Sequence, residues 1–357
     1  MKKDYKKLYK EILKEYDDIY KTLDVNSIKP SCGELRKYQL KTLVFCKKIL
    51  SQIDELNLKY FPIGGTLIGA IRHKGFVPWD DDFDIGMLRE DYETFLEFCK
   101  KNYIEMPSKK FSFSLDNRSR VWDKYLRKFP NRIIFARTPR HIQIIYGKSL
   151  NDCVNIDIFP HDRYSEDLSI DDFRKYVKHS EYRQFILDNH QKAIEYIDKE
   201  RKENPIYDKN SSKIYYGLDN IDNYILPHTD FFSDDIIFPL KKVKFEDIEI
   251  TIANKPEEYI KRQYKNYDKM PSDIIVFSHV KLRAGRFSFD FIKTLKRKMY
   301  RLLLAFVYRK SNFKNNLCID MALEEIRLRL YREKPDNIYK DLYEKFKEKL
   351  EFVKSIR

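Results

Sequence analysis

Apolar side chains recur with helical spacing in some stretches of the chain and with strand spacing in others, and the two kinds alternate over roughly the first 165 residues. Spacing of three or four positions predicts helices at residues 8–23, 34–53, 66–72 and 91–101. Alternation at every second position predicts strands at residues 59–63, 82–87, 111–115, 141–146 and 153–159. This interleaving predicts an α+β fold: a mixed β-sheet core flanked by helices, with an N-terminal helical segment.

The second half of the chain changes pattern twice. Residues 169–202 return to helical spacing, and residues 239–253 alternate as a hairpin whose parity slips at Glu246-Asp247, which marks the turn. Asn254 and Pro256 then predict the start of a helix. From residue 292 onward the spacing is helical throughout, ending in a charged amphipathic segment at 340–356. A composition change near residue 285 therefore divides the chain into N-terminal helices (1–58), a central domain (59–285) and a basic helical extension (286–357).

Composition narrows the class of protein. Hydrophobic residues make up 42% of the 357 positions, which is enough for a sizeable core. The five cysteines are scattered, which excludes a zinc knuckle and indicates reduced thiols. The N-terminus is charged where a signal peptide is apolar, and no run approaches the ~18 apolar residues of a membrane span. We therefore expect a cytoplasmic protein.

The net charge of +14 is concentrated near the C-terminus. Residues 291–319 hold eight Lys or Arg and no acidic side chain, and apolar positions recur between the basic ones at helical spacing. Such a helix can pack its apolar stripe on the protein, lie on an anionic membrane surface, or bind nucleic acid. The first reading is favoured, the second would place the protein at the inner face of the membrane, and nucleic acid is the least expected partner.

Four aspartates fall within the five residues Asp80 to Asp84, in an otherwise basic chain. In a strand, Asp82 and Asp84 point to one face and Phe83 and Ile85 to the other. Carboxylates this close repel unless a cation lies between them, and an oxygen-rich site that shares its ion with phosphates suits Mg²⁺, or Mn²⁺. An EF-hand beginning at Asp80 is excluded, because Ile85 stands where glycine is required. The plainer alternative is a solvated acidic turn after Pro78.

The stretch Gly64-Gly65-Thr66 lies where a strand meets a helix, which predicts a phosphate-binding corner. Asp157, between two isoleucines on a short hydrophobic strand, is a candidate for a third carboxylate. Strand, glycine pair, helix, loop and an Asp-x-Asp strand together form the layout of nucleotidyltransferase-type domains. The sequence thus predicts a phosphate anchor and a metal site, with Asp82, Asp84 and Asp157 as ligands, at one edge of a sheet.

These residues resemble the LicD family of phosphotransferases, whose relatives include fukutin and the fukutin-related protein. The resemblance rests on GGTLIGAIRHKGFVPWDDDFDIGM (64–87), on NIDIFPHD (155–162) and, more loosely, on FPLKKVKFEDIEITIANKPEEYIKRQY (238–264). The family's third block often ends in Tyr-Gly-Asp, whereas this chain has Tyr264-Lys265-Asn266, a difference that concerns the acceptor side of the site. The basic helices after residue 285 lie outside the resemblance.

The resemblance implies transfer of a phospho-alcohol group, such as phosphocholine or ribitol phosphate, from a CDP-activated donor to a hydroxyl of a cell-surface glycan or its lipid-linked precursor. CMP is released, and lipopolysaccharide or teichoic acid assembly is the implied setting. Asp82 and Asp84 would hold the metal ion, and Asp157 would complete its coordination or act as general base. A nucleotidyltransferase that adds NMP from an NTP to RNA, a sugar phosphate or a protein is the alternative. A non-enzymatic scaffold is disfavoured, since no aspartate is missing.

Four loop residues between the glycine pair and the aspartates are further substrate-binding candidates. Arg72, His73 and Lys74 could neutralise phosphate oxygens, although Arg72 is equally consistent with an ordinary surface residue. A general-base role for His73 is the less favoured reading. Trp79 is expected in core or loop packing, with stacking on cytosine or a cage for a quaternary ammonium as the alternative.

Overall fold

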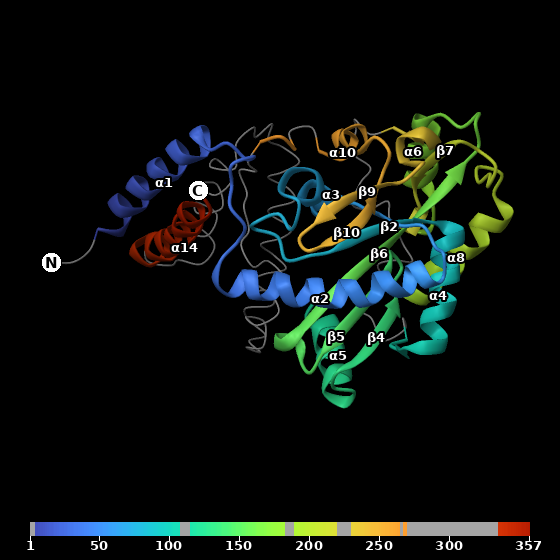
Figure 1. The fold of residues 1–357 in the computed structure, drawn as a ribbon, viewed down its shortest axis with the longest axis horizontal. Helices are drawn as coiled ribbons and strands as arrows, with labels where there is room; N and C mark the ends of the chain where they lie inside the picture. Colours follow the sequence, from blue (N-terminus) through green and yellow to red (C-terminus); the bar gives the residue numbers. More distant parts are fainter. Residues whose placement is uncertain (1–3, 108–114, 183–188, 220–229, 265–266, 270–334) are drawn as a thin grey trace. The chain divides into compact units, whose positions relative to one another are not determined.

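The computed structural model describes residues 4–107, 115–182, 189–219, 230–264, 267–269 and 335–357 (Figure 1). Its contacts group these residues into two units, one holding the two ends of the chain and the other residues 33–267. The predicted strand at 111–115 lies outside the described residues except for Leu115, and the predicted basic helix at 291–319 lies outside them entirely. The three-part division at residues 58 and 285 stays a prediction.

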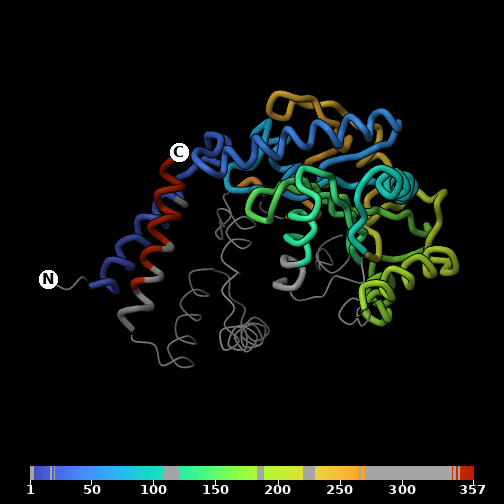
Figure 2. The backbone as a smooth tube through the Cα atoms, turned by 90° about the horizontal axis from the view of Figure 1, so that it is seen from below, coloured from blue at the N-terminus to red at the C-terminus, as the bar shows by residue number. Residues whose placement is uncertain are grey.

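The first unit is a pair of helices, α1 (Tyr5–Thr22) and α14 (Pro335–Ile356), which pack side by side (Figures 1 and 2). Tyr9 and Tyr16 on α1 both meet the ring of Phe346 on α14 edge-on. Asp4 caps α1 by accepting a hydrogen bond from the Lys7 N–H. Segments from opposite ends of the sequence therefore form one small core.

The second unit is built on a mixed sheet with the strand order β1-β2-β6-β5-β4-β3. Strand β6 runs parallel to β2 and antiparallel to β5, and its far end pairs with β7, which pairs with β8. The strands are β1 (Phe61–Pro62), β2 (Asp84–Leu88), β3 (Ile104–Glu105), β4 (Arg132–Arg137), β5 (Ile142–Gly147), β6 (Cys153–Tyr164), β7 (Lys213–Tyr216) and β8 (Phe232–Ser233). The predicted α+β class with a mixed central sheet is confirmed.

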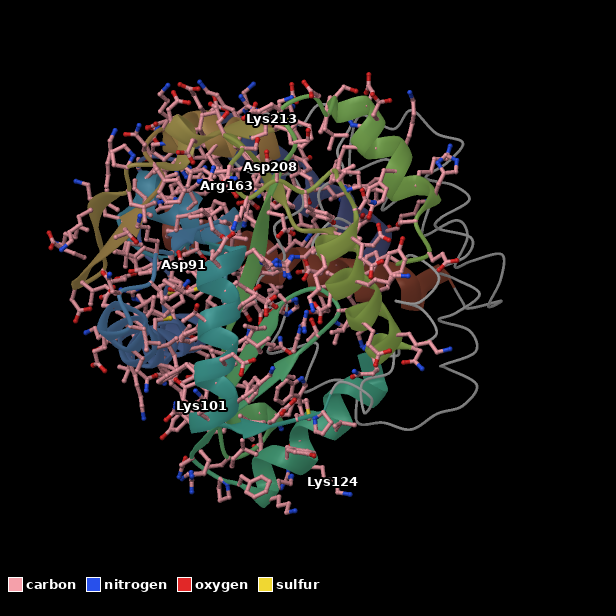
Figure 3. The ribbon with its side chains drawn as sticks, turned by 90° about the vertical axis from the view of Figure 1, so that its right-hand side faces the viewer. Asp91, Lys101, Lys124, Arg163, Asp208 and Lys213 are labelled. Carbon is pink, nitrogen blue, oxygen red and sulfur yellow. The ribbon has the colours of Figure 1, made fainter. Side chains whose placement is uncertain are left out.

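Helices flank this sheet, and α2 and α4 both contact β6 (Figure 1). In the view of Figure 3, Asp91 and Lys101 mark the two ends of α4, beside the strand that leads to Arg163. The helices are α2 (Gly33–Glu55), α4 (Arg89–Asn102), α5 (Leu115–Lys128), α6 (Ile170–His179), α8 (His190–Glu203) and α9 (Asp234–Ile237). The pattern did not predict α5, β3 or β4. The residues Ser31-Cys32-Gly33-Glu34 have the sequence of a capping box, but that prediction is wrong, because α2 begins at Gly33 and the Ser31 hydroxyl makes no hydrogen bond.

The predicted hairpin forms as β9 (Lys241–Phe245) and β10 (Ile248–Ile252), with its turn at Glu246 and Asp247. Helix α10 (Pro256–Gln263) follows, capped by Lys255 instead of the predicted Asn254. Both elements contact the short helical stretch made of α3 (Gly64–Ile68) and a π-helix, Gly69–His73. The later part of the chain thus encloses the glycine corner.

The alternation that the sequence predicts at the aspartate strand is observed. Phe83 and Ile85 are fully buried in the main core, whereas Asp82 and Asp84 are partly exposed on the other face. The cysteines of the described part, at positions 32, 46, 99 and 153, are free thiols. Among the described helices, none is both long and apolar enough to cross a membrane.

A buried ion cluster lies at the other end of β2 and β6. Arg89 donates two hydrogen bonds to Asp162, at 2.8 and 2.7 Å, and two to Asp219, at 2.9 and 2.7 Å. All three side chains are 4% exposed. Arg201 lies 3.3 Å from Asp162 and adds a second, more exposed cation. Because each buried charge has a partner, the cluster joins α4, β6 and the segment after β7.

Candidate active site

Asp84 and Asp157 lie directly opposite each other on the parallel strands β2 and β6. Residues in register on neighbouring strands project to the same face, so the two carboxylates share one side of the sheet. The Asp157 N–H donates to the Phe83 carbonyl at 3.3 Å, which locks this register next to the aspartate stretch. The structure therefore brings together two of the three predicted metal ligands.

The glycine corner lies against the same carboxylates. A Cβ atom at Gly65 would come within 2.1 Å of Asp80 Oδ2, so any other residue there would force the Asp80 carboxylate to move. A Cβ at Gly64 would lie 3.9 Å from Asp84 Oδ2, and the Gly64 N–H donates to Gln263 Oε1 at 3.3 Å. Gly65 thus makes space for Asp80, a role beyond the predicted phosphate contact, which stays a prediction.

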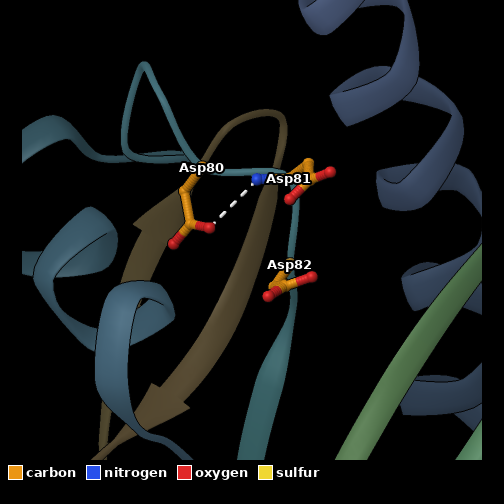
Figure 4. A group of neighbouring side chains, drawn as sticks. All are labelled: Asp80, Asp81 and Asp82. Carbon is orange, nitrogen blue, oxygen red and sulfur yellow. Dashed lines mark hydrogen bonds between the residues drawn. The ribbon is translucent and has the colours of Figure 1, made fainter. Parts of the chain in front are cut away.

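Three consecutive aspartates lie close enough together to hold one metal ion. In the described part of the chain, Asp80, Asp81 and Asp82 form a group in which one carboxylate oxygen from each lies within 4.8 Å of the others (Figure 4). The Asp81 N–H donates to Asp80 Oδ1 at 3.0 Å, which fixes the orientation of Asp80. This group shares only Asp82 with the predicted set of Asp82, Asp84 and Asp157, so Asp80 and Asp81 are additional candidates.

The donor chemistry of this region fits a hard divalent cation. Carboxylate oxygens from Asp80, Asp81 and Asp82, with Asp84 and Asp157 on the adjoining strands, are the ligands that Mg²⁺ or Mn²⁺ prefers. At such spacing the negative charges repel one another, and a cation between them would remove that repulsion. The residues present therefore fit the metal ion that the sequence predicts.

Thr66 holds the backbone of Asp84 in place. Its side chain is 3% exposed, and its hydroxyl accepts a hydrogen bond from the Asp84 N–H at 2.8 Å. The Asp84 carbonyl in turn accepts from the Ile63 N–H at 3.1 Å. The first turn of α3 is thereby tied to the start of β2, which makes Thr66 a support for Asp84.

Gln143 on β5 and His141, just before that strand, lie next to Asp157. Gln143 donates to Asp157 Oδ1 at 3.0 Å, and His141 Nε2 lies 3.5 Å from the same oxygen. His141 is 8% exposed, and its ring lies against Phe159 with centroids 4.8 Å apart. Gln143 therefore orients the Asp157 carboxylate, whereas His141 Nε2 lies near it without a hydrogen bond. Sequence reasoning missed both residues, because Gln143 reaches Asp157 only through the β5–β6 register.

The predicted loop residues form a cluster of their own. The Arg72 guanidinium lies 5.7 Å from the Trp79 ring centroid, donates to His73 Nε2 at 2.9 Å and also donates to the Tyr267 carbonyl. Burial and the nearby positive charge of Arg72 lower the pKa of His73 to about 4. A neutral histidine whose Nε2 already accepts a hydrogen bond is a weak base, which argues against the general-base reading.

Lys74 and Trp79 differ in their surroundings. Lys74 is exposed and takes a left-handed backbone conformation, with φ of 53°. Trp79 is partly exposed and meets the His73 ring edge-on at 6.3 Å. Its loop packing is as expected, and its partly exposed ring leaves stacking on a ligand as a prediction.

Tyr264, at the end of α10, reaches the same corner. Its hydroxyl is 3.7 Å from the Cβ position of Gly64, and its side chain is 39% exposed. Burial of the hydroxyl and the negative charges of Asp84 and Asp80 raise the pKa of Tyr264 to about 12. In the sequence, Tyr264 stood out only as the last residue of the stretch 238–264, the third part of the family resemblance. The structure places the end of that stretch beside the aspartates.

A strand pair carrying in-register aspartates, beside a glycine corner and a short helix, defines a nucleotidyltransferase-type domain. Residues 57–193 match the sequence model of the family described as LicD/FKTN/FKRP, nucleotidyltransferase domain. The resemblance seen in the sequence is thereby confirmed, and it extends over residues 57–193, which are similar to the LicD domain. This stretch contains the glycine corner, the aspartate stretch and Asp157, but not Tyr264 or the β9–β10 hairpin.

Curated relatives match over shorter stretches. The chain is 32% identical over 127 residues to the lipopolysaccharide cholinephosphotransferase LicD of Haemophilus influenzae, which covers 31% of this chain and 48% of that protein. It is 29% identical over 76 residues to the human ribitol 5-phosphate transferase FKRP, covering 21% of this chain and 14% of that protein. An uncharacterized Rickettsia prowazekii protein, RP689, is 31% identical over 98 residues, covering 20% and 37%. The chain thus spans less than half the length of each of these relatives.

Proposed function

We propose that this protein transfers a phospho-alcohol group, of the phosphocholine or ribitol-phosphate type, from a CDP-activated donor to a hydroxyl of a cell-surface glycan or its lipid-linked precursor. Two relatives are named for transferring a phosphorylated alcohol, cholinephosphate in one and ribitol 5-phosphate in the other. The observation that carries the proposal is the register of Asp84 with Asp157, beside the Asp80–Asp82 group and within the matched domain.

In the proposed reaction, the acceptor hydroxyl oxygen bonds to the phosphorus that carries the alcohol. The bond from that phosphorus to the bridging oxygen breaks, and CMP leaves with its electron pair. The hydroxyl proton passes to a base in the site. A divalent ion, Mg²⁺ or Mn²⁺, would supply charge neutralisation for the diphosphate and the departing CMP.

Residues of this chain would bind the ion, accept the proton and contact the phosphates. Asp80, Asp82 and Asp84 hold the ion, and Asp157 either completes its coordination or accepts the hydroxyl proton. Gln143 fixes one oxygen of Asp157 in both cases. Arg72, near the end of the π-helix, and the exposed Lys74 just after it lie between the glycine corner and the aspartates, where they would meet phosphate oxygens. Tyr264 would add a hydroxyl donor above Gly64.

We place this activity in the cytoplasm, with contact to the inner face of the membrane through residues 291–319 as a further part of the proposal. A lipid-linked acceptor would be met at that surface. Nucleic acid is not an expected partner.

The test is a screen of CDP-choline, CDP-ribitol, CDP-glycerol and CDP-ethanolamine with Mg²⁺ and an acceptor glycan, scored by CMP formation. One donor should give CMP, and chelation with EDTA should stop it. Asp84→Asn should abolish turnover, whereas Asp171→Asn, at a side chain that is 77% exposed, should not change it. Pyrophosphate release from an NTP, in place of CMP release, would favour the nucleotidyltransferase alternative.

Asp157→Asn separates the two roles of that residue. If Asp157 is a ligand, the affinity for Mn²⁺ falls together with turnover. If it is the base, turnover falls while the Mn²⁺ affinity is kept.

A further inference from the structure

The aspartate group belongs to a loop that is held in place from α2. Gln39 is fully buried, and its amide donates to the carbonyls of Val77 at 3.1 Å and of Asp80 at 2.8 Å. The Asp80 N–H closes the same turn by donating to the Val77 carbonyl at 3.0 Å. One side chain therefore fixes the backbone from which Asp80 projects.

The turn of the β9–β10 hairpin holds the other end of this loop. Arg36 forms a two-pronged ion pair with Glu246, with N···O distances of 2.8 and 2.6 Å. Glu246 Oε1 also accepts from the Phe76 N–H at 3.1 Å, and the Glu246 N–H donates to the Lys74 carbonyl at 2.6 Å. A Cβ at Gly75 would come within 2.3 Å of Glu246 Oε1, so the loop closes tightly around this carboxylate.

The backbone of Glu246 is in an unfavourable conformation. Its φ of 55° is in the left-handed region, which glutamate rarely adopts. Burial would raise the pKa of Glu246, but the hydrogen bonds from Arg36 and Phe76 outweigh it and lower the pKa. The strained backbone and the ionised, partly buried carboxylate indicate that the surrounding structure fixes this residue in one arrangement.

Aromatic packing joins the same turn to the aspartate strand. Phe245 meets Phe76 at 5.1 Å and Phe83 at 5.5 Å between ring centroids, and all three rings are buried. Phe83 lies between Asp82 and Asp84, so its anchoring limits movement of both neighbours. The hairpin turn thus contacts the loop before the aspartates and the strand that carries them.

We infer that Glu246, Arg36 and Gln39 are positioning residues that hold Asp80 and Asp82 at the spacing a divalent ion requires. The reason is electrostatic: carboxylates within 4.8 Å repel one another, and a loop free to move would separate them. External hydrogen bonds keep the group assembled before the ion arrives, as outer-shell partners do at metal sites. This inference rests on the ion site in the proposed function and adds the residues that set its affinity.

The experiment measures Tb³⁺ binding to the full chain by luminescence sensitised by tryptophan. The chain has two tryptophans, of which Trp79 directly precedes Asp80, so a Trp122→Phe background makes Trp79 the donor. In that background, Glu246→Gln and the milder Arg36→Lys should each weaken Tb³⁺ binding, by about 10-fold for Glu246→Gln. Mg²⁺ competition should show the same order.

Two controls separate positioning from general stability. Glu249→Gln changes an exposed glutamate on the same hairpin and should keep the affinity. Val177→Ala removes buried volume in α6, so it should lower the melting temperature without weakening Tb³⁺ binding.

The outcomes are distinct. If folded Glu246→Gln and Arg36→Lys bind Tb³⁺ as tightly as their parent, or if Val177→Ala weakens binding equally, the inference is overturned. If the parent itself gives no signal, or Asp82→Asn leaves the signal unchanged, the proposed ion site fails, and the positioning role fails with it.

Discussion

Replacing Arg89 by methionine should be among the most destabilising single changes in residues 33–267. Methionine keeps the length and much of the volume of arginine, but it removes all four hydrogen bonds to Asp162 and Asp219. Arg201, at 3.3 Å, remains as a cationic partner of Asp162, so the loss of the Arg89 charge affects Asp219 more than Asp162. Because both carboxylates are 4% exposed, water cannot replace the lost cation. Breaking a buried ion pair from one side costs about 3–5 kcal/mol, and that is the expected loss of unfolding free energy.

The assay is urea unfolding followed by tryptophan fluorescence, since both tryptophans lie within residues 33–267. Arg127→Met is the matched control, because Arg127 pairs with Asp123 at 2.6 Å but is 66% exposed. An exposed pair is worth about 0–1 kcal/mol. If Arg89→Met costs no more than Arg127→Met, the buried cluster does not carry the stability assigned to it.

The pH dependence gives an independent signature of the same cluster. Burial alone would raise the pKa of Asp162, but Arg89 outweighs this and lowers it. A lowered folded-state pKa gives stability that is present above the unfolded pKa, about 3.9, and lost as the pH falls through the folded value. Without Arg89 the effect of burial dominates, the folded pKa rises, and protonation then stabilises the fold. The gap between wild type and Arg89→Met should therefore shrink as the pH falls from about 7 toward about 4.

Three further predictions concern the site. Gly65→Ala should displace Asp80, whose Oδ2 would lie 2.1 Å from the new Cβ, and should weaken Mn²⁺ binding in a titration followed by electron paramagnetic resonance. Thr66→Val should cost about 1–3 kcal/mol in urea unfolding, because the Asp84 N–H loses its acceptor, whereas Thr66→Ser should retain most of the stability. His73→Gln should leave the pH profile of turnover near pH 6.5 unchanged, because a group with a pKa of about 4 is already neutral there. A shift of the acidic limb in that variant would restore His73 as a candidate base.

Local pattern was sufficient for much of the fold near the site. Alternation at Asp82-Phe83-Asp84-Ile85 predicted which side chains are buried, and parity at Glu246-Asp247 predicted the hairpin turn. Both follow from the two-residue period of a strand, which depends only on adjacent residues. The elements between residues 102 and 137 were predicted less well. The sequence of α5 is mostly polar and charged, and its few apolar side chains, among them Trp122 and Leu126, pack into a small second core that the local pattern alone does not indicate.

The candidate ligands show where sequence reasoning ends. Asp82, Asp84 and Asp157 were named from strand pattern and resemblance, and the structure brings Asp84 and Asp157 into register. It also groups Asp80 and Asp81 with Asp82. All three precede β2 and lie outside any regular element, so the two-residue period of a strand could not give the distances between them. Their spacing is set by hydrogen bonds from α2 and from the hairpin.

The residues that can carry the chemistry are recognisable from the order of amino acids alone: a glycine corner, a run of aspartates and one more aspartate on a later hydrophobic strand. How they come together follows from the folded arrangement of the chain. The parallel pairing of β2 with β6 places Asp157 opposite Asp84. Asp80 lies so close to Gly65 that a side chain at position 65 would collide with it. The contact of Glu246 with Arg36 joins two segments that are distant in sequence. The physical reason is that periodicity fixes the face on which a side chain lies, whereas distances between segments far apart in sequence depend on strand register and packing.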